Sequence, residues 1–220
     1  MTAAKPSKSL APPARTSYRH GDLRRALFEA GIELARDGGP DAVVLREATR
    51  RAGVVPNAAY RHFSSRLDLL REVRAAALSA VAAAMEKELA TVPTRGSAAQ
   101  IARAALRAVG TGYLRFARNE TGLFRTAFFA EPDVFQALTA GPAAGGPSGL
   151  NPFELLGAAL DRMVAAGVLP AAHRPGAEFL AWAAVHGLAL LIIDGPLRGI
   201  PARQVDALGQ RLLDMVEKGL

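Results

Sequence analysis

At 220 residues, the chain is long enough to bury one large hydrophobic core, or two smaller ones, without disulfide bonds or structural metal. Half of its residues are hydrophobic and 21% are charged, which is typical of a soluble globular protein. The sequence has no cysteine, so disulfides, thiolate metal sites and cysteine nucleophiles are excluded.

Two segments bear on the expected location of the protein. Residues 1–15 contain scattered lysines and prolines but no apolar core, so they do not resemble a secretory signal. The most apolar run, 188–193, is too short to span a bilayer and is followed by Asp194. We therefore expect a cytoplasmic protein without a membrane partner, which the absence of cysteine also fits.

The excess basic charge lies in the first third of the chain. The net charge is +7, and residues 1–75 hold 14 Lys and Arg against 8 Asp and Glu, whereas the rest holds 13 against 12. This distribution predicts a polyanionic partner for the N-terminal region. A non-specific DNA-compacting protein would spread its basic charge over the whole chain, so the pattern disfavours that class.

Hydrophobic periodicity predicts an all-α fold of about nine helices, with no alternating strand pattern. Residues 1–17 are expected to form a disordered arm. A first helix should begin near Asp22 and end at Gly38-Gly39-Pro40. Further helices are expected at about 45–52, 56–63, 66–89, 97–119, 122–129, 152–167, 175–193 and 202–218, with a Gly- and Pro-rich loop at 131–151.

Two short helices joined by a tight turn, between longer helices, form a candidate helix-turn-helix. In the stretch 46–54, Ala48 and Ala52 allow close helix packing, Gly53 tolerates a positive φ and Val54 enters the core. The following helix presents short and hydrogen-bonding side chains outward, and Phe63 turns back into the core. Such a helix fits the DNA major groove, where Asn and Arg read base edges and Tyr reaches a phosphate.

This motif resembles the DNA-binding region of the TetR family of repressors. The similarity covers residues 18–70 and rests on Ala-Gly-Val at 52–54, the aromatic Tyr60, the pair His62-Phe63 and the cation Arg66. The resemblance implies that Tyr60, His62 and Arg66 contact phosphates, that Asn57, Ala58 and Arg61 read bases, and that Arg46 flanks the groove. It also implies a ligand-released repressor that binds a palindrome-like operator as a homodimer, with 71–220 as the effector-binding and dimerisation domain.

The motif departs from the family pattern at two positions. Val44 and Val55 stand where the family often has Ser or Thr capping the two motif helices, and a lost cap costs about 1 kcal/mol. Operator affinity is then expected to be weaker, or to depend more on the basic arm. Arg50 and Arg51, taken alone, are interpreted as a solvated face rather than a DNA contact.

The C-terminal part contains Trp182, His186 and Gly187 in an apolar helix, followed by Asp194. This spacing resembles the Trp…His-Gly signature of one branch of TetR-like C-terminal domains. The resemblance implies that the last two helices pair with their copies in a four-helix dimer interface. The apolar residues for that seam, which the sequence leaves equally open to a role in the protomer core, are Leu188, Leu191, Ile192, Val205, Leu208, Leu212, Leu213 and Val216.

A pocket for a hydrophobic or aromatic effector is expected among the middle helices, because apolar walls with few polar groups suit such ligands. Core packing explains these aromatic residues equally well, and His186 is either a satisfied core histidine or a ligand contact. The candidate lining residues are Tyr113, Phe116, Phe124, Phe128, Met163, Trp182 and His186, with Phe129 beside them.

An enzyme is the alternative from another class. The four histidines lie far apart, none pairs at metal-ligand spacing, and the sequence contains no nucleophile elbow, P-loop or dinucleotide fingerprint. We therefore predict no catalytic residue, no metal and no cofactor. Activation rather than repression remains open, because the sequence does not show where the operator lies relative to a promoter.

Overall fold

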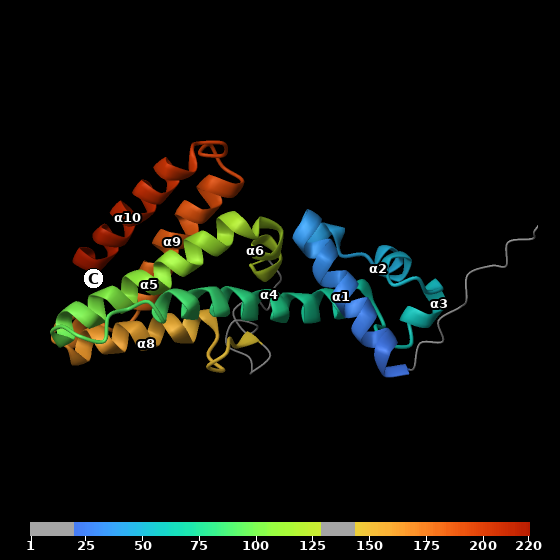
Figure 1. Cartoon of the computed structure of the whole chain (residues 1–220), viewed down its shortest axis with the longest axis horizontal. Coiled ribbons are helices and arrows are strands. Elements are labelled where there is room, and N and C mark those ends of the chain that lie inside the picture. The colour runs from blue at the N-terminus through green and yellow to red at the C-terminus, as the bar shows by residue number, and fades with distance from the viewer. Residues whose placement is uncertain (1–19, 129–143) are drawn as a thin grey trace, which may run out of the picture.

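The computed structural model describes residues 20–128 and 144–220, and within these ranges it contains α-helices, two short 3-10 helices and no strand (Figure 1). The all-α prediction is therefore confirmed. The nine α-helices of the described ranges are α1 (His20–Gly38), α2 (Leu45–Arg51), α3 (Pro56–Ala59), α4 (Arg66–Leu89), α5 (Ala98–Asn119), α6 (Thr121–Ala127), α8 (Pro152–Ala165), α9 (Ala177–Ile193) and α10 (Ala202–Gly219).

The first three helices form a small unit at one end of an elongated molecule (Figure 1). Leu27, Leu34 and Val43 are buried between them, and Phe63 is only 1% exposed, as the sequence predicts. Helix α3 is shorter than expected, because the chain tightens into a turn after Ala59, whose carbonyl accepts from both His62 N and Phe63 N. This tightening returns Phe63 to the core within four residues.

Helix α4 joins the two ends of the molecule (Figure 1). Ser65 caps its N-terminus by accepting a hydrogen bond from Asp68 N at 3.1 Å. Leu69 and Val73 pack toward α1, whereas Met85, four turns further on, lies among the C-terminal helices. The domain boundary expected at residue 70 thus falls inside one continuous helix.

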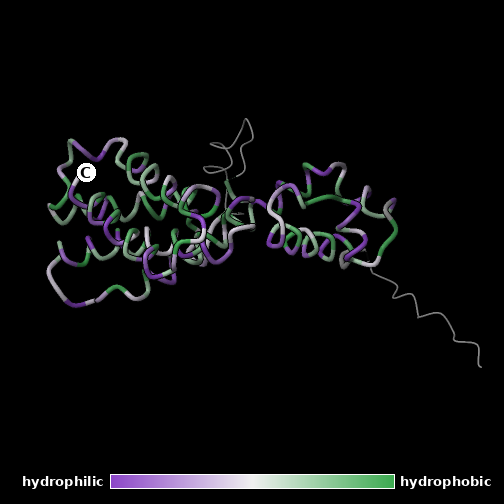
Figure 2. The backbone as a smooth tube through the Cα atoms, turned by 90° about the horizontal axis from the view of Figure 1, so that it is seen from above, coloured by the Kyte–Doolittle hydropathy of each residue, from purple (hydrophilic) through white to green (hydrophobic). Residues whose placement is uncertain are grey.

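Helices α5, α6, α8, α9 and α10 form the C-terminal bundle. Two of them begin with a capping box: Ser97 with Gln100 at α5, and Asn151 with Glu154 at α8. Figure 2 shows hydrophobic and hydrophilic residues alternating along the helices, as expected where one face of each helix is buried. Of the described helices, none is both long and apolar enough to cross a membrane.

Two glycines let helices touch backbone to backbone. A Cβ on Gly112 of α5 would lie 2.6 Å from Met85 Cα and 2.7 Å from the Ala84 carbonyl oxygen of α4. A Cβ on Gly122 of α6 would lie 2.2 Å from the Arg36 carbonyl oxygen and 2.3 Å from that of Ala35, at the end of α1. These contacts fix α4 against α5, and α1 against α6.

Gly112→Ala tests the first contact. The added methyl meets backbone, which cannot rotate away, so we expect a loss of about 1–3 kcal/mol in the free energy of unfolding, measured by urea denaturation. The control is Gly157→Ala in α8, where the nearest atom is Arg174 Nη2 at 3.6 Å and a gain of about 0.5–1 kcal/mol is expected. Equal changes in the two variants would contradict the close approach.

A candidate nucleic-acid interface and an apolar cavity

The turn between α2 and α3 has the geometry of a helix-turn-helix. Gly53 adopts φ +68°, a left-handed conformation that favours glycine, and Val54 N bonds to the Thr49 carbonyl at 3.0 Å. Ala48 and Ala59 are fully buried where the motif helices pack. The turn therefore holds α3 at the far tip of the molecule, with one side turned to solvent (Figure 1).

The residues expected to read DNA differ in exposure. Asn57 and Arg61 are exposed, Tyr60 is 59% exposed, and Ala58 and His62 are half-buried. Arg46 on α2 is also exposed, and its guanidinium forms no hydrogen bond or ion pair with any described residue. The structure thus presents polar side chains outward from the predicted recognition segment.

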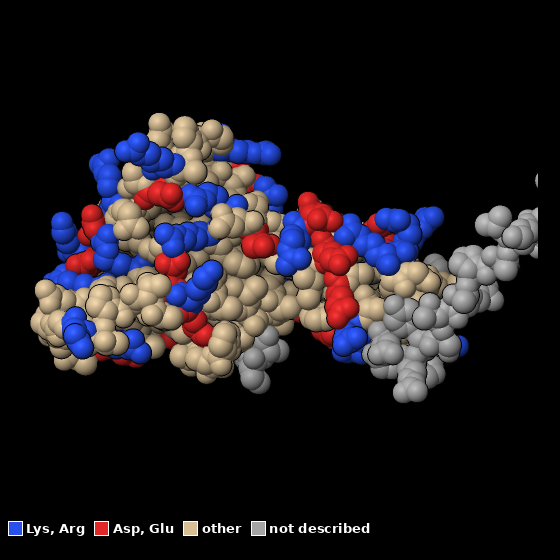
Figure 3. All heavy atoms as spheres, in the orientation of Figure 1, with Lys and Arg blue, Asp and Glu red and all other residues tan. Residues whose placement is uncertain are grey.

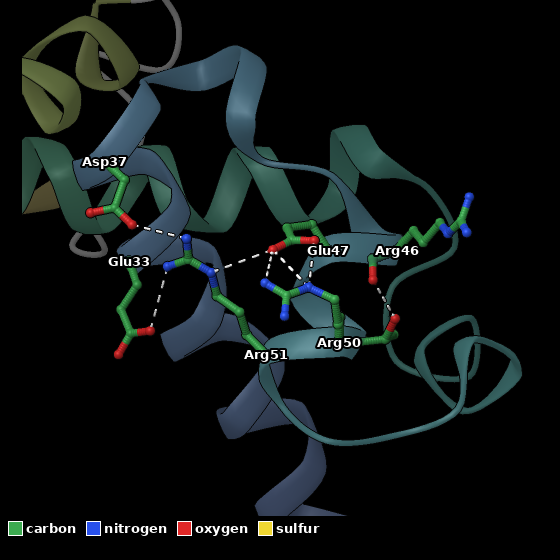
Figure 4. A network of polar contacts seen from close by, with 7 residues as sticks. Glu33, Asp37, Arg46, Glu47, Arg50 and Arg51 are labelled. Carbon is green, nitrogen blue, oxygen red and sulfur yellow. Dashed lines mark hydrogen bonds and ion pairs between the residues drawn. The ribbon is translucent and has the colours of Figure 1, made fainter.

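Arg50 and Arg51 are neutralised within the motif (Figure 4). Arg50 donates to both carboxylate oxygens of Glu47 at 2.6–3.1 Å, which lowers the pKa of that carboxyl. Arg51 donates to Asp37 at 2.9 Å and lies 3.7 Å from Glu33, and both acidic residues are on α1. Figure 3 shows acidic side chains in a row over α1. This network ties α2 to α1, which agrees with a solvated face for both arginines.

Two more arginines of this N-terminal part, Arg24 and Arg66, bind to other protein groups. Arg24 pairs with Glu72 and lies over the Phe63 ring at 5.3 Å. Arg66, expected to contact a phosphate, donates from Nε to the Val43 carbonyl at 2.8 Å and from Nη2 to the Pro40 carbonyl at 2.7 Å. These bonds hold the connection before α2 against the start of α4.

The basic excess is smaller in the described part of this unit. Residues 20–75 hold ten Lys and Arg against eight Asp and Glu, and the other four basic residues of the first 75 lie outside the described ranges. Those four residues are Lys5, Lys8, Arg15 and Arg19.

The two expected cap defects are present. Val44 and Val55 occupy the N-cap positions of α2 and α3 with extended backbones, and neither makes a side-chain cap. Thr49 is buried, and its hydroxyl donates to the Arg46 carbonyl at 2.7 Å, so its polar group is satisfied inside the helix.

An apolar cavity lies inside the C-terminal bundle, between α5, α8, α9 and α10. Its volume of about 40 Å³ holds only about three water molecules. Tyr113, Phe128 and Trp182, three of the predicted residues, line it. The sequence did not single out the other wall residues, which are ordinary apolar positions of their helices, among them Met85, Val109, Phe153, Leu156 and Val185.

Four of the predicted residues lie elsewhere. Phe116 and Met163 are buried, at 7% and 1% exposure, and are absent from the cavity wall, because they face other parts of the core. Phe124 and His186 stack in an aromatic cluster with Tyr113 and Phe128, with ring centroids 4.8–6.3 Å apart. Phe129 lies outside the described residues.

Tyr113 is the polar centre of this cluster. Its hydroxyl lies 2.7 Å from His186 Nδ1 and accepts from Trp182 Nε1 at 3.2 Å. Burial raises the pKa of the Tyr113 hydroxyl far above its usual value and lowers the pKa of His186 below 6.5, so both side chains are neutral near pH 7. His186 is thus a satisfied histidine at Nδ1.

A second, open space of about 470 Å³ lies between the two ends of the molecule. Gly38, Pro40 and Asp41 form its N-terminal side. The opposite side is formed by residues of α6 and α9 and the residue after α6, namely Phe124, Arg125, Phe128, His186 and Leu190. Phe128 lines both this cleft and the cavity. Arg125 is paired with Asp194 at the end of α9.

Helices α9 and α10 expose an apolar surface. Leu180 is 65% exposed, Leu191 43% and Met215 60%, with Leu208 beside them at 36%. Of the two roles that the sequence left open for the seam residues, Val205, Leu213 and Val216 have the protomer-core one, because they are buried, and Leu213 packs directly on Gly110 of α5. Leu188, Ile192 and Leu212 are half-buried.

No group of three or more metal-binding side chains is close enough to hold a metal ion in the described ranges.

Two protein families match the chain. Residues 27–73 match "Bacterial regulatory proteins, tetR family", and residues 106–216, half of the chain, match "Tetracyclin repressor-like, C-terminal domain". No curated protein sequence matches.

Several solved structures have the same fold. A protein of unknown function from Rhodococcus sp. RHA1 is 27% identical, with a TM-score of 0.71 over 94% of this chain and 99% of that one. FadR from Bacillus subtilis in complex with stearoyl-CoA is 13% identical, with a TM-score of 0.65 over 89% and 98%. PfmR, a TetR family regulator from Thermus thermophilus, is 21% identical, with a TM-score of 0.55 over 88% and 98%.

The missing cap of α2 gives a test. We expect Val44→Ser to exceed Val44→Ala by about 1 kcal/mol in the free energy of unfolding, because only the serine hydroxyl can accept a hydrogen bond from the first turn of α2. Urea denaturation of the two variants measures the difference. Identical midpoints would show that the first turn of α2 is already satisfied by solvent.

Proposed function

The chain belongs to the TetR family of DNA-binding transcription regulators, and we propose that it is a homodimeric repressor, acting in the bacterial cytoplasm, that leaves its operator when a small hydrophobic molecule enters the C-terminal bundle. The family is one of regulators and not of enzymes. In this proposal, residues 18–70 bind DNA, 71–220 bind the effector and form the dimer, and 1–17 are a basic arm.

Base reading is assigned to α3 and the turn after it. Asn57 and Arg61 are exposed and carry the hydrogen-bonding groups that distinguish base edges, while Ala58 allows close approach to the groove. Tyr60 and His62 are assigned to phosphates, and Arg46 to the flank of the groove. Two copies of α3 would enter successive major grooves about 34–36 Å apart on a palindrome-like site.

Arg66 combines two roles in this proposal. A guanidinium has five N–H donors, and the bonds to Pro40 and Val43 use only two of them. The remaining donors can contact a phosphate while the bound ones hold the start of the motif in place. Because Arg24, Arg50 and Arg51 are paired with carboxylates, the four basic residues at positions 5–19 contribute a large share of the phosphate neutralisation.

Dimerisation is assigned to the apolar surface of α9 and α10. Leu180, Leu191 and Met215 are exposed on adjacent helices, and large exposed apolar patches mark contact surfaces. A two-fold axis through this surface would pair α9 and α10 with their copies in a four-helix interface.

The observation that carries the proposed response to an effector is the position of α6. Gly122 touches the end of α1, and Phe124 and Phe128 reach the aromatic cluster beside the cavity. Because the cavity has a volume of only about 40 Å³, an effector has to push its walls apart. That displacement would move α6 and, through it, the reading unit, which consists of α1, α2 and α3.

FadR from Bacillus subtilis, which shares the fold, was solved in complex with stearoyl-CoA, whose long acyl chain supports an apolar chain as the part of an effector that enters the present cavity. Activation instead of repression depends on where the operator lies relative to the promoter.

Arg61→Ala is the test of base reading. The variant should lose discrimination between operator and scrambled duplex, with about 1–3 kcal/mol of preference removed, because a base-specific contact is deleted and the dimer is retained. Fluorescence anisotropy with both duplexes at two salt concentrations measures this preference.

The matched control is Arg50→Ala, which removes an arginine already bound to Glu47 and should leave the preference for operator unchanged. A retained preference in Arg61→Ala, or an equal loss in Arg50→Ala, would remove Arg61 from the base-reading residues.

A further inference from the structure

The wall of the cavity is mostly apolar, and the charge of its one ionised residue, Arg107, is balanced by Asp214. Its polar side chains are Arg107, Tyr113 and Trp182. Arg107 is bound to Asp214 and to Gln210, and the polar atoms of Tyr113 and Trp182 bind each other and His186. A buried polar group without a partner is strongly unfavourable, so this mostly apolar wall favours an apolar part of a ligand.

The hydrogen bonds of the cluster fix the direction in which its protons point. An indole N–H is a donor only, so Trp182 Nε1 donates to the Tyr113 oxygen. The buried Tyr113 hydroxyl has a single proton, and His186 Nδ1 at 2.7 Å is the only acceptor bonded to it among the described residues, so we assign Nδ1 as the acceptor. Since this nitrogen accepts, the neutral His186 ring carries its proton on Nε2.

His186 Nε2–H is therefore the free end of the chain of hydrogen bonds. It forms no hydrogen bond with any residue in the described ranges, and His186 lines the cleft toward Pro40 and Asp41. Phe128 separates this cleft from the apolar cavity, because it lines both. The Phe128 ring thus lies between the cleft, which His186 lines, and the apolar cavity.

We propose that the effector is a molecule with an apolar chain and a neutral carbonyl oxygen: the chain enters the cavity past Phe128, and the oxygen accepts a hydrogen bond from His186 Nε2. This inference rests on the proposed effector response and names the chemical class of the effector.

The charges of the cleft favour a neutral head group. Arg125 is already paired with Asp194, so it does not offer an unpaired cation to a carboxylate. Asp41, which lies 3.8 Å from Arg66, would repel a carboxylate. An ammonium group would face the Nε2–H donor without a lone pair to accept its hydrogen bond. A carbonyl oxygen satisfies the donor without adding charge.

The same geometry makes such a ligand touch both ends of the molecule. Its chain would lie among α5, α8, α9 and α10, and its head group would lie beside Pro40 and Asp41, which precede α2. A head group in the cleft would therefore push directly on the connection that Arg66 holds.

Trp182 provides the readout, because it is the only tryptophan of the chain and lines the cavity. We would titrate the protein with 2-undecanone, decanoate and 1-decylamine and follow Trp182 emission. The ketone should bind about tenfold more tightly than either charged probe. A tighter binding of decanoate or 1-decylamine, or no saturable change with any of the three, would overturn the proposal.

His186→Phe keeps the ring and removes the donor. We expect its affinity for 2-undecanone to fall about five- to tenfold, as for loss of one hydrogen bond, while that for 1-decylamine does not fall. His173→Phe, at an exposed position, is the matched control and should bind 2-undecanone like the wild type. Unchanged ketone binding in His186→Phe would contradict the assignment.

A measurement on the wild-type protein tests the same site without depending on the folding of a variant. Long-range ¹H–¹⁵N correlation of the His186 ring should show the proton on Nε2 and a shift of Nε2 when 2-undecanone is added. A proton on Nδ1, or an Nε2 that does not respond to bound ketone, would overturn the proposal.

Fluorescence anisotropy of labelled operator DNA in the same samples measures release of DNA. It therefore distinguishes a failure of the carbonyl site from a failure of the proposed ligand-released repressor. Binding of 2-undecanone that depends on His186, but without release of DNA, would support the site and contradict the ligand-released repressor. Release of DNA by all three probes alike would support the repressor and contradict the carbonyl site.

Discussion

Besides the continuous helix α4, one backbone contact sets the position of the reading unit: Gly122 at the start of α6 touches the carbonyl oxygens near the end of α1. A Cβ at this position would lie 2.2 Å from the Arg36 oxygen, so no other residue fits without movement of the two helices. The pairs Arg36–Glu120 and Arg125–Asp194 lie on either side of this contact. Helix α6 is only seven residues long, and Phe124 and Phe128 follow Gly122 within two turns, so α6 is a short rigid link between the aromatic cluster and α1.

The cavity and helix α6 stabilise the same arrangement of the helices. A small cavity with Phe128 in its wall keeps Phe128 and α6 in one place, and α6 keeps α1 in place. A ligand shifts such an equilibrium only by binding the widened state more tightly than the closed one, and a cavity of about 40 Å³ provides this difference because it excludes the ligand when closed. The hydrogen bonds among Trp182, Tyr113 and His186 keep the polar atoms of the cluster satisfied in the closed state.

Much of this fold follows from local sequence signals. Ser97 with Gln100, Pro56 at a first helical position and Gly53 at the turn each act within a few residues, so their effects can be predicted from the sequence. Other features depend on contacts between distant segments, which local sequence signals do not contain. The carbonyls of Pro40 and Val43 capture Arg66, Gly110 draws Leu213 into the protomer, and the burial of Phe116 and Met163 depends on which helices face each other. Helix periodicity predicts which apolar residues face inward. Which of them line the cavity and which fill the core depends on packing between helices.

The most direct test of this account is the distance between the two reading units of the proposed dimer. The chain has no cysteine, so a spin label at Glu29→Cys, on the exposed face of α1, gives a single distance between protomers by pulsed electron paramagnetic resonance. Arg162→Cys on α8 gives the reference distance. With 2-undecanone bound, as Trp182 emission reports, the distance at residue 29 should change and that at residue 162 should not. An unchanged distance at residue 29 with the ketone bound would contradict the link through α6.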